Sequence, residues 1–260
     1  NSSELRRTYA CQQPEVIRFG NKLGQSRIIY NSLLELKNKK HKELDETQLR
    51  IIETELLSMS HRGIGLNGED KKVFNETSEK LAELSNTFSN HVLDATKSWG
   101  LVLTKPSEVE GLPSRVLKSL ASSGEVTART SPKDSYRDKK DNGPWKISLD
   151  MPTYLAFMAH AKNRSLREVV YKAQVSKASS GTFNNREIIE EILTLRKKQA
   201  NLLGYKSWAD LSLASKMAKD VNEVENLIEE LRAAAMPIAE KELKELKECA
   251  NRKGAPEANN

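Results

Sequence analysis

Apolar residues recur at steps of three or four along most of this chain, the spacing that places them on one face of an α-helix. The clearest stripe predicts a helix from about Glu69 to Ser98. Its apolar members are Phe74, Leu81, Leu84, Phe88, Val92, Ala95 and Trp99. A helix of about 30 residues is roughly 45 Å long, so we expect it to be the structural spine of a domain.

Two further helices are predicted upstream of this spine. The first runs over 14–40, with a proline at its start. Asp45 is the predicted N-cap of the second helix, with Gln48 three residues later as its capping-box partner, and that helix ends near Met59. The segment 61–65 contains two glycines, which tolerate positive φ, so we expect a turn there.

Five helices are predicted downstream. The first is a short one that starts after Gly111-Leu112-Pro113, and the others cover 151–161, 165–178, 186–203 and 221–251. The last of these carries its apolar residues on one side. Pro237 lies inside it, has no amide proton and crowds the carbonyl of Ala233, so we expect a kink there.

Two short segments predict β-structure. The run at about 101–104 is apolar, and 145–149 alternates between apolar and polar residues, so the two could pair as a hairpin-like element. Between them, 122–143 loses the apolar pattern and holds five basic and four acidic residues, which predicts a long charged loop. The expected fold is mainly α, a multi-helix array of long packed helices with this one small β-element.

Composition narrows the possible functions. The net charge is +6, but 42 basic residues are interspersed with 36 acidic ones and aromatic residues make up only 5%. We therefore expect no nucleic-acid partner, since phosphate binding needs a contiguous basic face. No window of about 18 apolar residues occurs, so no membrane span is predicted. Cys11 and Cys249 stand at opposite ends and are interpreted as two reduced thiols.

The histidines do not form a recognisable metal motif. A zinc hydrolase built on a helix needs H-E-x-x-H, which places two imidazoles one turn apart beside a general base. The four histidines are His41, His61, His91 and His160. No two are closer than 20 positions, and none is directly followed by a glutamate.

Other candidate groups are also interpreted as structural. His41 with Asp45 and His91 with Asp94 stand at helical spacings, typical of surface or capping interactions. The acidic residues Glu187, Glu190 and Glu191 lie near a helix start, where negative charge suits the helix dipole. We therefore predict no catalytic, cofactor-binding or metal-binding residue in this chain.

Several strings of residues carry a resemblance to a known family. They include Phe74-Asn75-Glu76, Leu81-Ala82-Glu83-Leu84-Ser85, Glu108-Val109-Glu110-Gly111-Leu112-Pro113, Asp150-Met151-Pro152-Thr153-Tyr154, Arg167-Glu168-Val169-Val170-Tyr171, Ala178-Ser179-Ser180-Gly181, Leu202-Leu203-Gly204-Tyr205 and Lys216-Met217-Ala218. Together, and in this order, they resemble the oligopeptidase A and thimet oligopeptidase family of zinc metallopeptidases. The resemblance covers most of 14–250.

The resemblance implies a mostly helical enzyme with a deep channel, in which zinc and its ligands belong to a downstream half. Residues 1–260 would then be the helical N-terminal portion and one wall of the channel, with the zinc-binding catalytic domain absent. Zinc and short peptide substrates are implied for the full-length protein, as are a monomeric state and a place in the cytoplasm. If a targeting peptide precedes this segment, the interior of a chloroplast or mitochondrion is implied instead.

Further expectations and alternatives remain. The missing initiator Met and the end shortly after Pro256 suggest a fragment at both ends. We expect the chain alone neither to hydrolyse peptides nor to hold zinc at a catalytic site, and the spine and last helices to expose apolar patches. The alternatives are a non-catalytic helical interaction or regulatory protein derived from that family, and a basic nucleic-acid binder.

Overall fold

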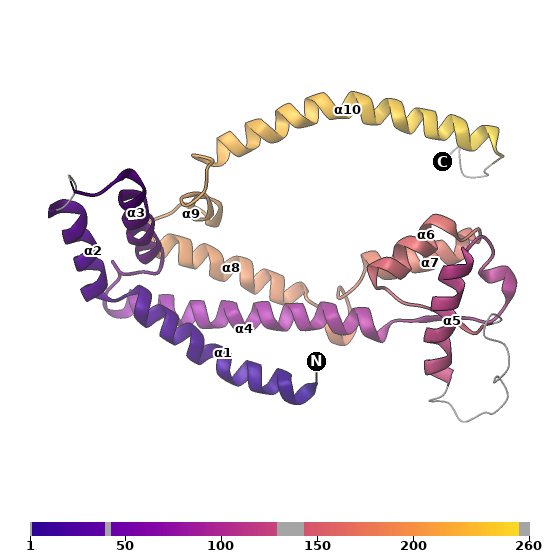
Figure 1. Ribbon diagram of the computed structural model, residues 1–260, viewed down its shortest axis with the longest axis horizontal. Coiled ribbons are helices and arrows are strands. Elements are labelled where there is room, and N and C mark those ends of the chain that lie inside the picture. Colours follow the sequence, from indigo (N-terminus) through magenta and orange to yellow (C-terminus); the bar gives the residue numbers. More distant parts are fainter. Residues whose placement is uncertain (1, 40–42, 129–142, 255–260) are drawn as a thin grey trace. The chain divides into compact units, whose positions relative to one another are not determined.

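The computed structural model describes residues 2–39, 43–128 and 143–254, which are mostly helical (Figure 1). The α-helices are α1 (Ser3–Gly24), α2 (Arg27–Lys39), α3 (Glu46–His61), α4 (Gly68–Ser98), α5 (Ser114–Ala128), α6 (Met151–His160), α7 (Arg164–Val175), α8 (Arg186–Leu202), α9 (Trp208–Leu213) and α10 (Val221–Arg252). Two 3₁₀-helices, η1 (Pro106–Glu108) and η2 (Gly181–Phe183), and two strands, β1 (Leu101–Leu103) and β2 (Trp145–Ile147), complete the described elements. The predicted fold class is confirmed.

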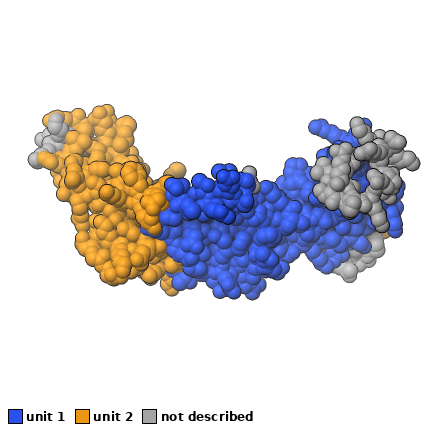
Figure 2. All heavy atoms as spheres, turned by 90° about the horizontal axis from the view of Figure 1, so that it is seen from below, with its two compact units in different colours: residues 1–14, 79–194 blue, residues 15–78, 195–260 orange. Residues whose placement is uncertain are grey.

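The chain divides into two compact units (Figure 2). Unit 1 comprises Asn1–Pro14 and Glu79–Thr194, and unit 2 comprises Glu15–Ser78 and Leu195–Asn260. Each unit has its own buried apolar residues and is described separately below.

Unit 1 is built around the predicted pair of strands. β1 and β2 are antiparallel, with Leu101 opposite Ile147 and Leu103 opposite Trp145, which confirms the hairpin-like pairing. The alternation in β2 puts Trp145 and Ile147 into the core at 2% and 0% exposure. Side chains of α5, α6 and α7 cover them. The core consists of Leu103, Val109, Leu112, Leu120, Ala121, Trp145, Ile147, Phe157, Ala161 and Val170.

Helix α5 continues further than the sequence pattern suggests. We expected a loop from residue 122, but the helix runs to Ala128, and the rest of the expected loop, 129–142, lies outside the described residues. Ser122 and Ser123 interrupt the apolar pattern, but the helix accommodates them because their hydroxyls donate to carbonyls one turn earlier. Next to them, a Cβ on Gly124 would overlap the carbonyl oxygen of Pro144, so the helix approaches β2 through a bare backbone.

The α6–α7 pair is set by caps. Asp150 accepts a hydrogen bond from the amide of Thr153, and Pro152 occupies the first turn, so α6 begins as predicted. Asn163 caps α7 by accepting from the amide of Leu166. The predicted end of α7 at 178 is wrong: it ends at Val175, and Ala178 adopts φ 55°, which a helix cannot include.

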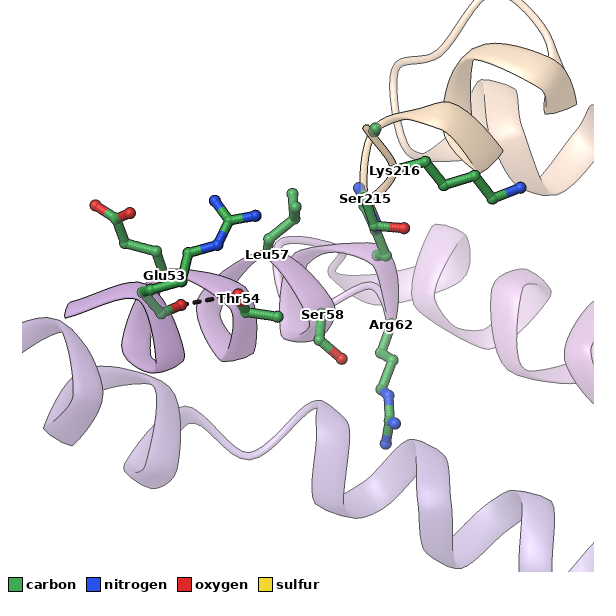
Figure 3. Close-up of a pocket in the computed structure, with 10 residues that line it drawn as sticks. Glu53, Thr54, Leu57, Ser58, Arg62, Ser215 and Lys216 are labelled. Carbon is green, nitrogen blue, oxygen red and sulfur yellow. Dashed lines mark hydrogen bonds between the residues drawn. The ribbon is translucent and has the colours of Figure 1, made fainter. Parts of the chain in front are cut away.

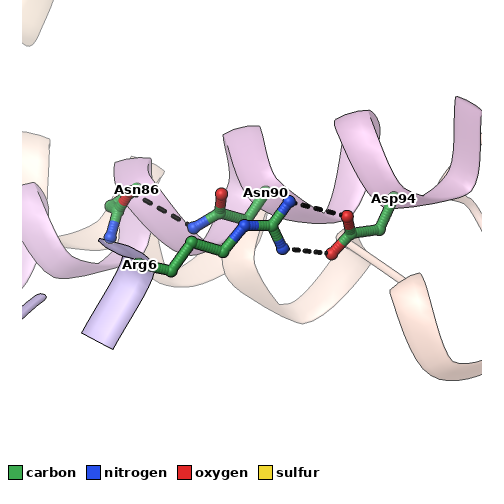
Figure 4. Close-up of polar contacts among 4 residues, drawn as sticks. All are labelled: Arg6, Asn86, Asn90 and Asp94. Carbon is green, nitrogen blue, oxygen red and sulfur yellow. Dashed lines mark hydrogen bonds and ion pairs between the residues drawn. The ribbon is translucent and has the colours of Figure 1, made fainter. Parts of the chain in front are cut away.

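The expectation of a single helix over 14–40 is also wrong. α1 begins at Ser3, with Pro14 inside it. The part of α1 in unit 1 is held on α4, because the guanidinium of Arg6 donates two hydrogen bonds of 2.6 and 2.7 Å to the carboxylate of Asp94 (Figure 4). Gln13 donates a further one to the carbonyl of Ala82. These contacts join distant parts of the sequence, so local periodicity could not show them.

In unit 2, the same stretch breaks between α1 and α2. The side-chain amide of Gln25 is 6% exposed and donates to the carbonyl of Arg62 at 2.8 Å and to the side chain of Asn75 at 2.7 Å. A Cβ on Gly24 would overlap the side chain of Arg62. The corner is thus fixed by close packing and by a buried amide network, and α2 starts afresh at Arg27.

Helix α3 confirms its predicted start. Asp45 accepts from the amide of Gln48 at 2.8 Å, and the Gln48 side chain accepts from the amide of Asp45 at 3.0 Å, a complete capping box. The following turn includes Gly63 at φ 79°, as its glycines suggested. The apolar core of this part consists of Ile52, Leu56, Met59, Ile64 and Phe74.

The remaining elements of unit 2 are α9, α10 and the end of α8. α8 ends at Leu202, one residue before the predicted end at residue 203, and Gly204 follows at φ 83°. The six-residue α9 was not predicted; its N-cap Ser207 accepts from the amide of Asp210. Helix α10 runs through Pro237 without a break, and its ribbon is bowed (Figure 1). A kink localised at Pro237 stays a prediction.

The two helices expected to expose apolar patches, α4 and α10, differ in how far their apolar residues are buried. The stripe of α4 is buried or half-buried, so the expectation is wrong for the spine helix. For α10 it is confirmed, since every residue from 225 to 248 is exposed.

Replacing Gly124 with alanine should destabilise the protein by about 1 to 3 kcal/mol or more, because the new methyl group has to displace the backbone at Pro144. The matched control is Gly20→Ala in α1, where nothing lies within 4 Å of the added Cβ. That variant should gain about 0.5 to 1 kcal/mol from helix propensity. Urea unfolding followed by circular dichroism measures both, and equal stability of the two variants would contradict the close approach.

Candidate functional site

A cavity of about 650 Å³ lies in unit 2, between α3 and the segment that follows α9 (Figure 3). Most of the residues that line it are charged or polar. The lining residues are Arg50, Glu53, Thr54, Leu57, Ser58, His61, Arg62, Ala214, Ser215 and Lys216.

The charged groups of this cavity do not converge on one point. Glu53 pairs with Lys37 at 2.9 Å, and the ammonium of Lys216 donates to the hydroxyl of Ser212 at 2.8 Å. In Figure 3 the side chains of Glu53, Arg62 and Lys216 point in different directions. The geometry therefore lacks the converging donors that would hold a carboxylate or phosphate in a fixed position.

His61 joins this cavity to the turn after α8. Its Nε2 lies 2.9 Å from the phenol oxygen of Tyr205, and the two rings meet edge to face with centroids 5.6 Å apart. Burial lowers the pKa of His61 below its ordinary value of 6.5, because the neutral imidazole is favoured where water is excluded. The pair contains no carboxylate that could orient the imidazole, so it lacks the third member of a catalytic triad.

His91 has a structural partner in unit 1. Its Nδ1 lies 2.9 Å from the side-chain oxygen of Asn185, so this nitrogen carries the proton and donates it. Asn185 is 3% exposed and donates in turn to the carbonyl of Phe88 at 3.2 Å. Next to these hydrogen bonds lies a cavity of about 350 Å³ with a largely apolar lining that includes Phe88, Val92 and Ile189. The arrangement fixes the start of α8 on α4.

The helical spacing of His91 and Asp94 does not give a direct pair. Asp94 is bonded to Arg6, which holds the pKa of that carboxyl below its ordinary value, while His91 is bonded to Asn185. Sequence reasoning missed both partners because each lies about 90 positions away, at separations of 88 and 94 residues.

The other candidate residues are placed as follows. His160 is exposed at the end of α6, and His41 lies outside the described residues. Glu187, Glu190 and Glu191 are exposed in the first turns of α8, as interpreted from the sequence. Among residues 2–39, 43–128 and 143–254, no three His, Cys, Asp or Glu side chains gather as metal ligands.

Two other predictions concern thiols and membranes. Cys11 is exposed, Cys249 is half-buried, and both are free, which agrees with two reduced thiols. Within the described part of the chain, none of the helices combines the length and the apolarity needed to cross a bilayer.

Comparison with known proteins finds two family models. The model "Neurolysin/Thimet oligopeptidase, N-terminal domain" matches residues 1–71, and "Peptidase family M3" matches residues 157–260.

Similar proteins match almost the whole chain. It is 40% identical to the "Probable cytosolic oligopeptidase A" of Arabidopsis thaliana, over 99% of this chain and 36% of that protein. The "Organellar oligopeptidase A, chloroplastic/mitochondrial" of the same plant is 39% identical over 99% of this chain and 32% of its own length. Oligopeptidase A of Escherichia coli is 32% identical over 96% of this chain and 36% of its own length. The chain therefore spans about a third of the length of these relatives.

The His61–Tyr205 contact predicts a pH dependence of stability. The unfolded chain takes up the proton near pH 6.5 and the folded chain only at lower pH, so stability should fall as the pH drops below 6.5. Thermal unfolding of the protein and of His61→Gln, at about pH 7.5 and about pH 5.5, measures this. The melting temperature should fall less on acidification in His61→Gln than in the unmodified chain. The exposed His160, changed to Gln, is the control and should retain the full acid sensitivity; an equal response of all three proteins contradicts the prediction.

Proposed function

This chain belongs to peptidase family M3, and from that membership we propose that it is the upstream helical portion of an oligopeptidase. The whole protein would cleave short peptides with metal-activated water. One observation carries the proposal: the identity of 40% extends over 99% of this chain but over only 36% of the relative. Residues 1–71 match a model of an N-terminal domain, which supports placing the matched part upstream of most of the uncovered two thirds of the relative.

We propose that this chain has a structural role in the whole protein, as a framework, and does not carry the catalytic residues. The family uses zinc. The described residues do not fit that metal, because His61 and His91 are bonded to Tyr205 and Asn185 and no group of ligands gathers around either. We assign zinc and its ligands to the part of the family protein that this chain does not cover.

The framework proposed is one wall of the substrate channel. Long helices suit this role because they are stiff, and α4 and α10 contain 31 and 32 residues. A wall of this kind would admit short extended peptides and exclude folded proteins. Basic and acidic residues are interspersed along the sequence, which argues against nucleic acid as a partner.

The names of the relatives support two locations. One is described as cytosolic and the other as chloroplastic or mitochondrial. We propose the cytoplasm for this protein, or the interior of one of these organelles if a targeting peptide precedes the segment. A monomer is proposed as well.

A chimera tests the proposed function. This chain replaces the matching third of the Arabidopsis probable cytosolic oligopeptidase A, and the product is assayed with a short fluorogenic peptide. We expect cleavage that a chelator abolishes and that added zinc restores. The 260-residue chain alone should show no such cleavage.

Two results would contradict the proposal. One is chelator-sensitive cleavage by the chain alone. The other is a chimera that is monomeric by sedimentation, folded by circular dichroism and resistant to limited proteolysis, yet inactive. The unmodified Arabidopsis enzyme, assayed in parallel, is the positive control.

A further inference from the structure

Helix α10 leaves most of its apolar surface in water. After its first turn, which contacts α9, the helix has no buried residue from 225 to 248. The large apolar side chains in this stretch are each more than half exposed, except Met236 at 43%. They are Leu227, Ile228, Leu231, Ile238, Leu243 and Leu246. Met236 stands seven residues before Leu243 and therefore shares the side of Leu243, whereas Leu227, Leu231 and Ile238 share another side.

An exposed apolar stripe of this length indicates an interface. A helix of 32 residues is about 48 Å long, and most of the stability of such helices comes from packing an apolar face rather than from helix propensity. The opposite face is polar and includes Asn226, Glu240 and Lys244. The helix is therefore amphipathic, and its apolar residues from 225 to 248 are exposed in the part of the chain that the structure describes.

We propose that this face of α10 is the surface on which the catalytic remainder of the family M3 fold packs. This rests on the proposed function, since it names the contact between the framework and the catalytic part. The candidate occupant is the two thirds of the relatives that this chain does not match, since the M3 match continues through α10 to residue 260.

A second copy of this chain fits the stripe less well. A two-stranded coiled coil needs an apolar repeat of seven residues. Ile228 and Leu231 are followed seven residues later by Ala235 and Ile238, but the next such positions are Glu242 and Glu245. A coiled coil along the whole helix would bury these two carboxylates in each chain, which is costly unless they are paired.

The stripe also changes direction along the helix. The step from Ile238 to Leu243 is five residues, which turns the apolar side by about 140° around the helix axis. One straight partner helix cannot cover both halves. Two or more packed elements can, which is what a large multi-helix domain supplies.

A membrane surface is the third possible occupant. Helices that lie on anionic bilayers carry Lys and Arg on their polar face. α10 contains eight glutamates against five lysines and arginines, so its excess charge is negative and opposes such binding.

Hydrogen exchange on the chimera tests this contact. In the 260-residue chain alone, the amides of 225–248 should exchange quickly, because this helix is uncovered and opens locally. In the chimera the same amides should exchange at least about 100-fold more slowly. A chimera that is active but leaves α10 unprotected would overturn the inference while leaving the proposed function intact, whereas a folded, inactive chimera counts against the function.

Two triple variants make the test specific to the stripe. Leu227→Ser, Leu231→Ser and Ile238→Ser remove apolar side chains from the exposed face, and Asn226→Ser, Glu240→Ser and Lys244→Ser change the polar face to the same extent. The stripe variant should lower the melting temperature of the chimera by several degrees. In the isolated chain, the stripe variant should leave the melting temperature of the part outside α10 unchanged. The polar-face variant should change the melting temperature of neither the chimera nor the isolated chain.

The rival occupants give different results. A concentration-dependent dimer of the isolated chain in sedimentation, lost in the stripe variant, would overturn the inference in favour of a second copy. Binding of the isolated chain to phosphatidylcholine–phosphatidylserine vesicles, with protection of 225–248, would overturn it in favour of a membrane. A monomer that does not bind the vesicles supports the packing of α10 on the catalytic part.

Discussion

An amphipathic helix is stable in water only when its apolar face is covered, and this requirement explains most features of both units. In unit 1 the two short strands supply the surface against which α5, α6 and α7 pack. Ile147, Phe157 and Val170 are each 0% exposed there, and burying a side chain of this size contributes about 1.5 to 3 kcal/mol. The sheet is small, yet without it three helices would have no common core.

Features that depend on neighbouring residues could be predicted from the sequence, whereas features that depend on distant contacts could not. Helix periods and caps are local, so the capping box of Asp45 and Gln48, the end of α8 to within one residue and the alternation of β2 were found correctly. The break between α1 and α2 was missed because it depends on the bonds of Gln25 to residues about 40 to 50 positions away. The six-residue α9 is too short to show a period.

For the candidate site, too, local features could be predicted and distant contacts could not. Residue spacing could show that no local pair of imidazoles exists, since H-E-x-x-H depends on one helical turn. It could not show the actual partners of the histidines, because Tyr205 is 144 positions from His61 and Asn185 is 94 positions from His91. The cavity beside His61 was likewise invisible, since α3 and residues 214–216 meet only in the folded unit.

Framework and chemistry can be separated in a family of this kind because they place different demands on the chain. Hydrolysis by metal-activated water needs a few side chains held within tenths of an ångström, and a helix turn supplies that locally. A wall needs length, stiffness and a face that matches its neighbour, and these are distributed over many residues. This chain has the second set of properties in α4 and α10, whereas His61 and His91 serve to tie helices together. In the proposed packing, the uncovered stripe of α10 is one half of an interface, and its change of direction after Ile238 favours a second half made of more than one element.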